Sequence, residues 1–200
     1  MHTTDGKFIP HNLYYVRQHE KPRKLINLRQ QDNAKIIKLF NRSYIKLKSK
    51  HGLANAAWEN LMIYCRALDL PGYHQAFTRL WAVMESLSGI QPSESHDKIV
   101  SRNAFLYTDP EHVKLMLHHL RTTRNKLVHS DMEITSESEE LVIYQLNRFV
   151  CHLLNEYIYN AGKFMTVSDF ISFLDHPLDA NVLRSRLNVL QKAYDHRKDI

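Results

Sequence analysis

The segment RNKLVH, residues 124–129, brings together three side chains suited to chemistry on a phosphate ester. The imidazole of His129 titrates near neutral pH and is suited to transferring a proton. The guanidinium of Arg124 can hold a phosphate through two parallel hydrogen bonds and stabilise the charge of a transition state. Asn125 lies four residues before His129, so on a helix its amide can orient that imidazole or the phosphate. Together, these side chains can bind a phosphate and transfer a proton beside it.

Arg124 raises a question of burial if residues 110–129 form one helix. At about 100° per residue, Arg124 falls in the middle of an apolar stripe that includes Val113 and Leu117. An unpaired charge in the interior is costly, and arginine cannot lose its proton to avoid that cost. Two interpretations stay open. The guanidinium pairs with a carboxylate inside the fold, or the stripe opens into a cleft where a phosphate binds.

Each candidate also has a plain structural interpretation. His129 at a helix end can interact with the negative end of the helix dipole, and Asn125 can cap or solvate that end. Glu85 flanks the apolar stripe of an earlier expected helix, where it can pair with Arg124 and orient it without taking part in catalysis. An ideal helix separates Arg124 and His129 by about 140°. Convergence on one phosphate therefore requires the long arginine stem, an unwound last turn or a second copy of the chain.

The elements that must position these residues are all expected to be helices. Apolar residues recur at i, i+3 and i+4 spacing, and Gly, Pro and capping residues separate the segments. We expect helices at about residues 32–50, 53–69, 73–88, 97–105, 110–129, 136 or 138–160, 166–175 and 180–197. Trp58 and Trp81 lie at core spacing and are expected to pack inside. The sequence thus predicts an all-α helical bundle over residues 32–200, preceded by a basic segment, residues 1–31, that is irregular or holds a short strand.

The composition excludes several classes of protein. Apolar residues make up 44% of the chain, which argues against wholesale disorder. The two cysteines are too few for a disulfide scaffold, and no paired Cys/His knuckle or HExxH motif predicts a metal site. No phosphate-binding glycine motif is present, so no cofactor is expected. No apolar run approaches the roughly 20 residues of a membrane span, and a cytoplasmic protein without membrane contact is expected.

The basic residues are concentrated in the first quarter of the chain. Residues 1–50 hold twelve Lys and Arg against three acidic residues, whereas the remainder holds fifteen against eighteen. Such a segment is suited to neutralising the phosphates of RNA. A solvated basic helix, or a contact with an acidic neighbour, explains the same charge equally well. The residues expected to contact RNA are Lys46, Lys48 and Lys50, together with Arg121 and Lys126 beside the RNKLVH segment.

Two separated motifs resemble those of HEPN domains. Arg124, Asn125 and His129 match the family's Arg-x(4–6)-His motif, in which Asn is a common residue after the arginine. The upstream segment RLWAVMESLSG, residues 79–89, is similar to the Leu-Trp-x-x-Leu-Glu-x-Leu helix of the Apea-like branch, with Met84 in place of the more usual leucine. The resemblance covers about residues 50–165, and it departs from the family at both ends of the chain.

The resemblance implies a helical bundle that pairs as a homodimer, with two motifs facing one cleft. It implies a metal-independent endoribonuclease in which Arg124, His129 and Asn125 assist attack of the RNA 2′-OH on the adjacent phosphate. Many such domains belong to defence or toxin systems, so an antitoxin or a sensor is a candidate partner. Other members only bind RNA or nucleotides, or serve as dimerisation modules, and this remains the alternative.

Overall fold

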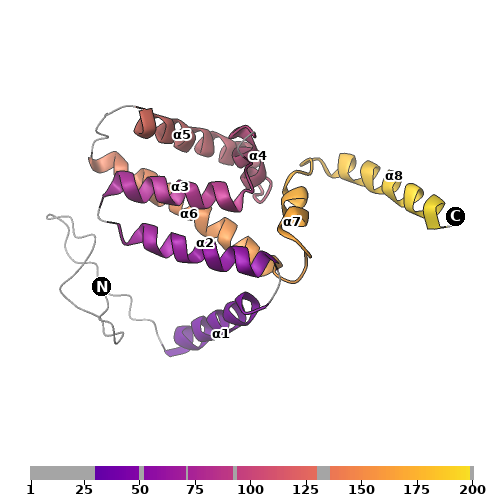
Figure 1. The fold of residues 1–200 in the computed structure, drawn as a ribbon, viewed down its shortest axis with the longest axis horizontal. Coiled ribbons are helices and arrows are strands. Elements are labelled where there is room, and N and C mark those ends of the chain that lie inside the picture. Colours follow the sequence, from indigo (N-terminus) through magenta and orange to yellow (C-terminus); the bar gives the residue numbers. More distant parts are fainter. Residues whose placement is uncertain (1–29, 50–51, 71, 92–93, 130–135, 199–200) are drawn as a thin grey trace.

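Eight α-helices make up the part of the chain that the computed structural model describes, residues 30–49, 52–70, 72–91, 94–129 and 136–198 (Figure 1). They are α1 (Gln30–Leu47), α2 (Gly52–Leu68), α3 (Tyr73–Leu87), α4 (Asp97–Ala104), α5 (Pro110–His129), α6 (Ser136–Asn160), α7 (Val167–Leu174) and α8 (Ala180–Lys198). The predicted all-α class is confirmed, and each helix begins and ends within one turn of its expected bounds. The expectation for residues 1–29 lies outside the described residues, whereas residues 30 and 31 belong to α1.

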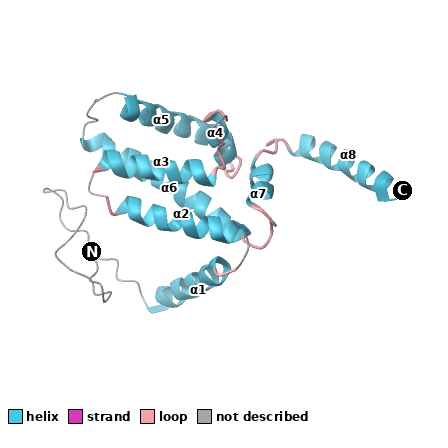
Figure 2. Cartoon of the chain, in the orientation of Figure 1, coloured by secondary structure: helices cyan, strands magenta, loops and turns pink. Residues whose placement is uncertain are grey.

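The helices α2, α3 and α6 form the centre of the bundle, and Figure 2 shows α5 lying beyond α3. The helix α4 packs against both α5 and α7. Large apolar side chains from these helices form one continuous core, because their helical spacing places them on facing stripes. Its largest fully buried members are Trp81, Tyr157, Phe77, Phe170, Leu53, Leu80, Met84, Leu87, Ile99, Leu117, Leu120 and Leu146.

Local sequence signals set several of the helix ends. Asp109 accepts a hydrogen bond from the backbone N–H of His112 at 3.1 Å and so caps the N-terminus of α5. Thr166 and Asp169 form a reciprocal capping box at the start of α7. Gly89 follows α3 with a φ of 62°, a conformation that glycine adopts without steric cost.

A buried arginine joins the end of α3 to α4 and α7. The side chain of Arg102 is only 3% exposed. Its Nε and Nη2 donate to the two carboxylate oxygens of Asp175 at 2.7 and 2.8 Å, and its Nη1 donates to the carbonyl of Ser88 at 2.7 Å. Through its hydrogen bond, Arg102 holds the pKa of Asp175 below its usual range. The buried charge is therefore paired, as a folded interior requires.

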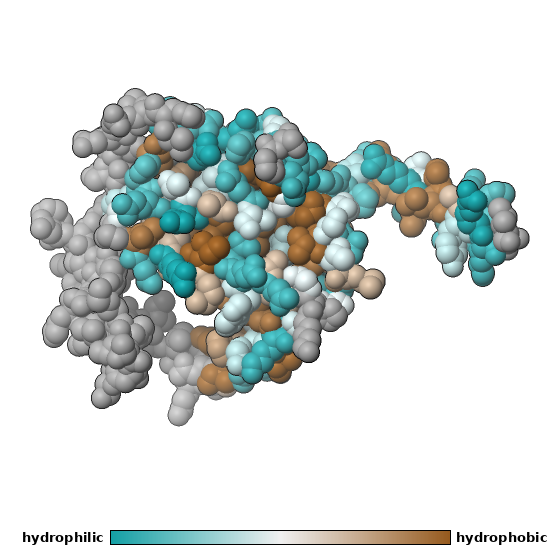
Figure 3. All heavy atoms as spheres, in the orientation of Figure 1, coloured by the Kyte–Doolittle hydropathy of each residue, from teal (hydrophilic) through white to brown (hydrophobic). Residues whose placement is uncertain are grey.

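The first and last helices lie outside the core. Every described side chain of α8 is partly or fully exposed, and Figure 1 shows this helix extending away from the bundle. The space-filling view shows apolar side chains at the surface of α8 and of the lower helix α1 (Figure 3).

The expectation that Trp58 packs inside is wrong. Trp58 is 47% exposed because it lies on the outer face of α2, whereas Trp81 is buried.

Candidate functional site

The RNKLVH segment forms the last turns of α5, which ends at His129. The guanidinium of Arg124 is partly exposed, and its Nη1 donates to Oδ1 of Asn125 at 3.4 Å. Asn125 itself is exposed. His129 belongs to the helix by its backbone, but its side chain lies outside the described part of the structure. Arg124 therefore lies on the same apolar stripe of α5 as Val113 and Leu117 but is partly exposed, whereas those two residues are buried.

Glu85 has other partners than the one considered from the sequence. Its Oε1 accepts a hydrogen bond from Trp81 Nε1 at 2.7 Å and lies 3.0 Å from His96 Nε2. Among the described side chains, no carboxylate lies within ion-pair distance of Arg124. Glu85 instead anchors the indole of a core tryptophan and the start of α4. The Arg124 charge is therefore met by Asn125 and solvent in this part of the structure.

A second imidazole lies beside the motif, and sequence reasoning missed it. His74, in the first turn of α3, places Nε2 3.1 Å from the backbone carbonyl of Leu127. The last four carbonyls of a helix have no partner within it, so this contact satisfies one of them. Spacing along the chain offers no signal for it, because 53 residues separate the pair. Only the packing of α3 against α5 brings His74 to the RNKLVH segment.

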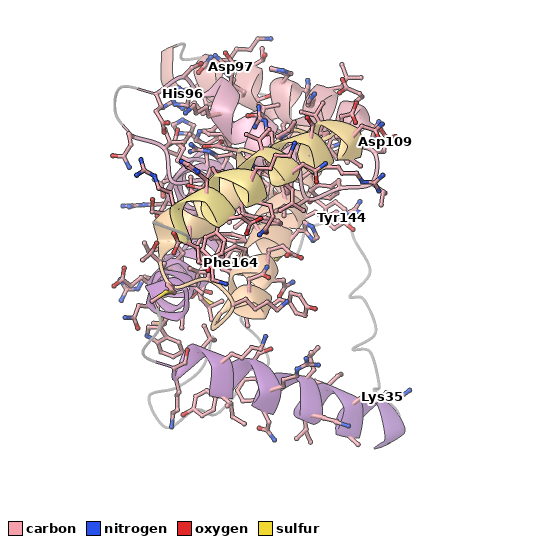
Figure 4. The ribbon with its side chains drawn as sticks, turned by 90° about the vertical axis from the view of Figure 1, so that its right-hand side faces the viewer. Lys35, His96, Asp97, Asp109, Tyr144 and Phe164 are labelled. Carbon is pink, nitrogen blue, oxygen red and sulfur yellow. The ribbon has the colours of Figure 1, made fainter. Side chains whose placement is uncertain are left out.

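Two of the expected RNA-contacting residues lie near this end of α5. Arg121 forms an ion pair with Asp97 at the start of α4, where Figure 4 places Asp97 next to His96. Hydrogen bonds from Ser95 and Arg121 hold the pKa of Asp97 below its usual range. Lys126 is exposed on the motif itself. Arg121 thus serves the fold as well as the local positive charge.

The other expected RNA contacts lie away from the RNKLVH segment, near the C-terminal end of α6. Lys46 places Nζ 4.9 Å from the ring centroid of Tyr159, near the C-terminal end of α6. Lys48 lies over the ring of Tyr44 at 4.6 Å, and Lys50 lies outside the described residues. Partial burial first, and then Arg42 and Lys163, lower the pKa of Lys46. The four described candidates therefore form two separate positive regions, with Arg121 and Lys126 near the end of α5 and Lys46 and Lys48 near the C-terminal end of α6.

Metal ligands and membrane spans were also sought in the structure. Among the described residues, no three His, Cys, Asp or Glu side chains come close enough together to bind a metal ion. None of the described helices has the length and apolar character to cross a bilayer.

No protein-family model, curated protein or solved structure matches the chain. The resemblance to HEPN domains therefore depends on the two sequence motifs. Their placement can still be stated. The RLWAVMESLSG segment covers the second half of α3 and the two residues after it, the RNKLVH segment ends α5, and the two helices pack against each other.

Proposed function

We propose that this protein is a metal-independent endoribonuclease that uses Arg124, Asn125 and His129. The observation that carries this proposal is the position of Arg124. Its guanidinium is partly exposed near the end of α5 and donates a hydrogen bond to Asn125. Among the described side chains, no carboxylate forms an ion pair with it. A partly exposed guanidinium can bind a phosphate through two parallel hydrogen bonds. His129 ends the same helix, about one turn further on.

The reaction proceeds by attack of the RNA 2′-OH on the adjacent phosphorus. A base removes the 2′-OH proton, the bond between phosphorus and the 5′-oxygen breaks, and an acid protonates that leaving oxygen. The products are a 2′,3′-cyclic phosphate and a 5′-OH end. Arg124 stabilises the negative charge on the phosphorane, and His129 performs one of the two proton transfers.

A homodimer supplies the second proton-transfer group in this proposal. Arg124 and His129 point about 140° apart on an ideal helix, and a second copy brings another RNKLVH segment to the same cleft. Sedimentation velocity at micromolar concentration tests the pairing. A dimer is expected, and a strict monomer would remove the paired-histidine mechanism.

An assembly role without cleavage is the second candidate. The exposed apolar side chains of α8 favour it, because Leu187, Leu190 and Tyr194 are 64%, 66% and 63% exposed at helical spacing. In that case the same protein binds RNA or a partner, such as an antitoxin or a sensor, and cuts nothing.

Cleavage of defined RNA in EDTA separates these candidates. One oligonucleotide is all ribose, and its matched control carries 2′-deoxyribose at the mapped cut site. We expect cleavage of the first, with 2′,3′-cyclic phosphate ends, and none at the modified site of the second. Cleavage of both would exclude attack by the 2′-OH. Binding without cleavage of either would favour the assembly role.

A further inference from the structure

A cavity of about 510 Å³ lies between the first turns of α5 and the middle of α6, away from the RNKLVH segment. It begins at Tyr107, just before α5, and His112 and Met116 line it from α5 itself. Arg124 lies about two to three turns further along that helix. A cavity of this size falls in the range of small-molecule sites. The nuclease proposal makes no use of it.

Aromatic rings form one wall of this cavity. The ring of Tyr107 lies 4.5 Å from that of His152 and 5.8 Å from that of Phe149, centroid to centroid. The Tyr107 and Phe149 rings meet nearly edge to face, at 69°. A half-buried ring held in this way offers a flat surface on which the planar ring of a ligand can stack.

The polar part of the lining favours an anion. Arg148 contributes a permanent positive charge and His112 an imidazole, while the described lining residues include no Asp or Glu. Gln145, Asn147 and Asn155 add amide groups. Burial raises the pKa of Tyr107 to about 12. The nearby positive charge of Arg148 opposes that rise, and the negative charge of Glu156 adds to it. The Tyr107 hydroxyl therefore keeps its proton. The Arg148 guanidinium lies close enough to affect the electrostatics of the Tyr107 side chain.

Two polar side chains of the lining, Asn147 and His152, differ in their hydrogen bonding. The hydroxyl of Tyr64 donates to Oδ1 of Asn147 at 2.7 Å, which fixes the orientation of that amide. Nε2 of His152 is buried and has no hydrogen-bond partner in the described structure.

We propose that this cavity binds a small ligand that carries a planar ring and one anionic group. The ring stacks on Tyr107, and the anionic group lies between Arg148 and His112. Nucleoside monophosphates and aromatic carboxylates share this chemistry. The inference is independent of the nuclease proposal, since none of its residues belongs to the RNKLVH segment.

Isothermal titration calorimetry of the full chain tests the proposal with four probes. They are adenosine 5′-monophosphate, 2-naphthoate, adenosine and inorganic phosphate. We expect one-to-one binding of the monophosphate, the naphthoate or both. Adenosine and phosphate, which each lack half of the required chemistry, should bind at least about tenfold more weakly. Phosphate binding as tightly as either ring-bearing anion, or no binding of any probe, would overturn the proposal.

Variants locate the binding within the cavity. Arg148→Gln should weaken binding of the ring-bearing anion about tenfold or more, because glutamine cannot form the charge-assisted hydrogen bond. Tyr107→Leu should weaken it about tenfold by removing the stacking surface. Arg66→Gln, an exposed arginine on α2, is the matched control and should bind as the wild type does. Unchanged affinity in Arg148→Gln, whose exposed side chain makes misfolding no concern, would contradict the site.

The two proposals fail separately. Arg124→Ala and His129→Ala should abolish RNA cleavage and keep the affinity for the ring-bearing anion within about twofold. If instead these variants no longer bound the small ligand, the ligand would bind at the RNKLVH segment and the cavity would not be its site.

Discussion

The imidazole of His74 joins the first turn of α3 to the last turn of α5 through the carbonyl of Leu127, with Nε2 and the oxygen 3.1 Å apart. This hydrogen bond reaches the middle of the RNKLVH segment, so it positions the backbone that carries Arg124 and His129. A helix end is otherwise prone to fray, because its last carbonyls have no partner.

Removing this hydrogen bond should loosen the end of α5. In His74→Ala we expect amide hydrogen exchange around residues 127–129 to rise about tenfold, as the absence of one modest hydrogen bond would give. His74→Gln keeps an N–H donor and should restore most of the protection. RNA cleavage, if measured in parallel, should fall in the alanine variant and recover in the glutamine variant. Equal exchange in wild type and His74→Ala would show that the hydrogen bond does not hold the segment.

The Arg102–Asp175 ion pair should contribute to the stability of the fold. Asp175→Asn leaves the buried guanidinium with only part of its hydrogen bonding, and we expect the free energy of unfolding to fall by about 2 kcal/mol. Asp69→Asn, an exposed aspartate at the end of α2, should change it by no more than about 0.5 kcal/mol. Urea denaturation of wild type and both variants measures the difference. A pair of equally stable variants would contradict the anchoring role.

The same pair has a defined pH dependence. The pKa of Asp175 is lowered in the folded state, so its stabilisation is present above the usual aspartate pKa and disappears as the pH falls through the folded value. The stability difference between wild type and Asp175→Asn should therefore be constant near pH 7 and shrink below about pH 4. Denaturation curves at several pH values measure it. A difference that grew in acid would have the wrong sign.

Gly89 should not accept a side chain. Its φ is +62°, and a β-carbon built there would lie 2.7 Å from Cγ1 of Ile171. We expect Gly89→Ala to lower the free energy of unfolding by about 2 to 3 kcal/mol, from backbone strain and overpacking together. Gly52→Ala is the matched control, because the nearest atoms to its β-carbon are 3.9 Å away and it lies at a helix start. The control should be neutral or slightly stabilising.

The basic N-terminal segment should strengthen RNA binding through its positive charge. Deleting residues 1–29 should weaken binding and make it less sensitive to salt, by roughly 0.7 in the logarithmic slope for each RNA phosphate that is no longer neutralised. Fluorescence anisotropy with labelled RNA at several salt concentrations measures both. Unchanged slope and affinity would discard the electrostatic contribution of this segment.

Much of the fold could be predicted because its signals are local. Apolar spacing predicts each helix, and Asp109 and Gly89 mark helix ends by chemistry that needs no tertiary contact. Periodicity does not reveal which apolar face is covered, so it predicts Trp58 inside although this residue lies outside. It also cannot reveal contacts between distant segments. The pairing of Arg102 with Asp175, and the position of His74 beside Leu127, depend on packing between helices far apart in the chain.

The candidate site was predictable only as far as one helix carries it. The sequence places Arg124 and Asn125 together, but it predicts that Asn125 orients His129 or the phosphate, whereas the structure pairs its Oδ1 with Arg124. One partner of Glu85 could have been found from spacing, because Trp81 lies four residues earlier on the same helix. The other partner, His96, depends on packing between two segments of the chain. Lys46 and Lys48 belong to a basic segment of the sequence. Nothing in that sequence indicates that they lie near the C-terminal end of α6, away from the RNKLVH segment.

Cleavage of labelled RNA in EDTA by Arg124→Ala and His129→Ala tests the central claim most directly. Arg66→Ala and His176→Ala, which remove an exposed arginine and an exposed histidine elsewhere, are the matched controls. Circular dichroism establishes that all four variants fold. We predict at least a hundredfold loss of cleavage rate in the first two proteins, in line with the usual contribution of a proton-transfer or charge-stabilising group, and wild-type rates in the controls. Wild-type cleavage by either of the first two variants would contradict the assignment of that residue to the site.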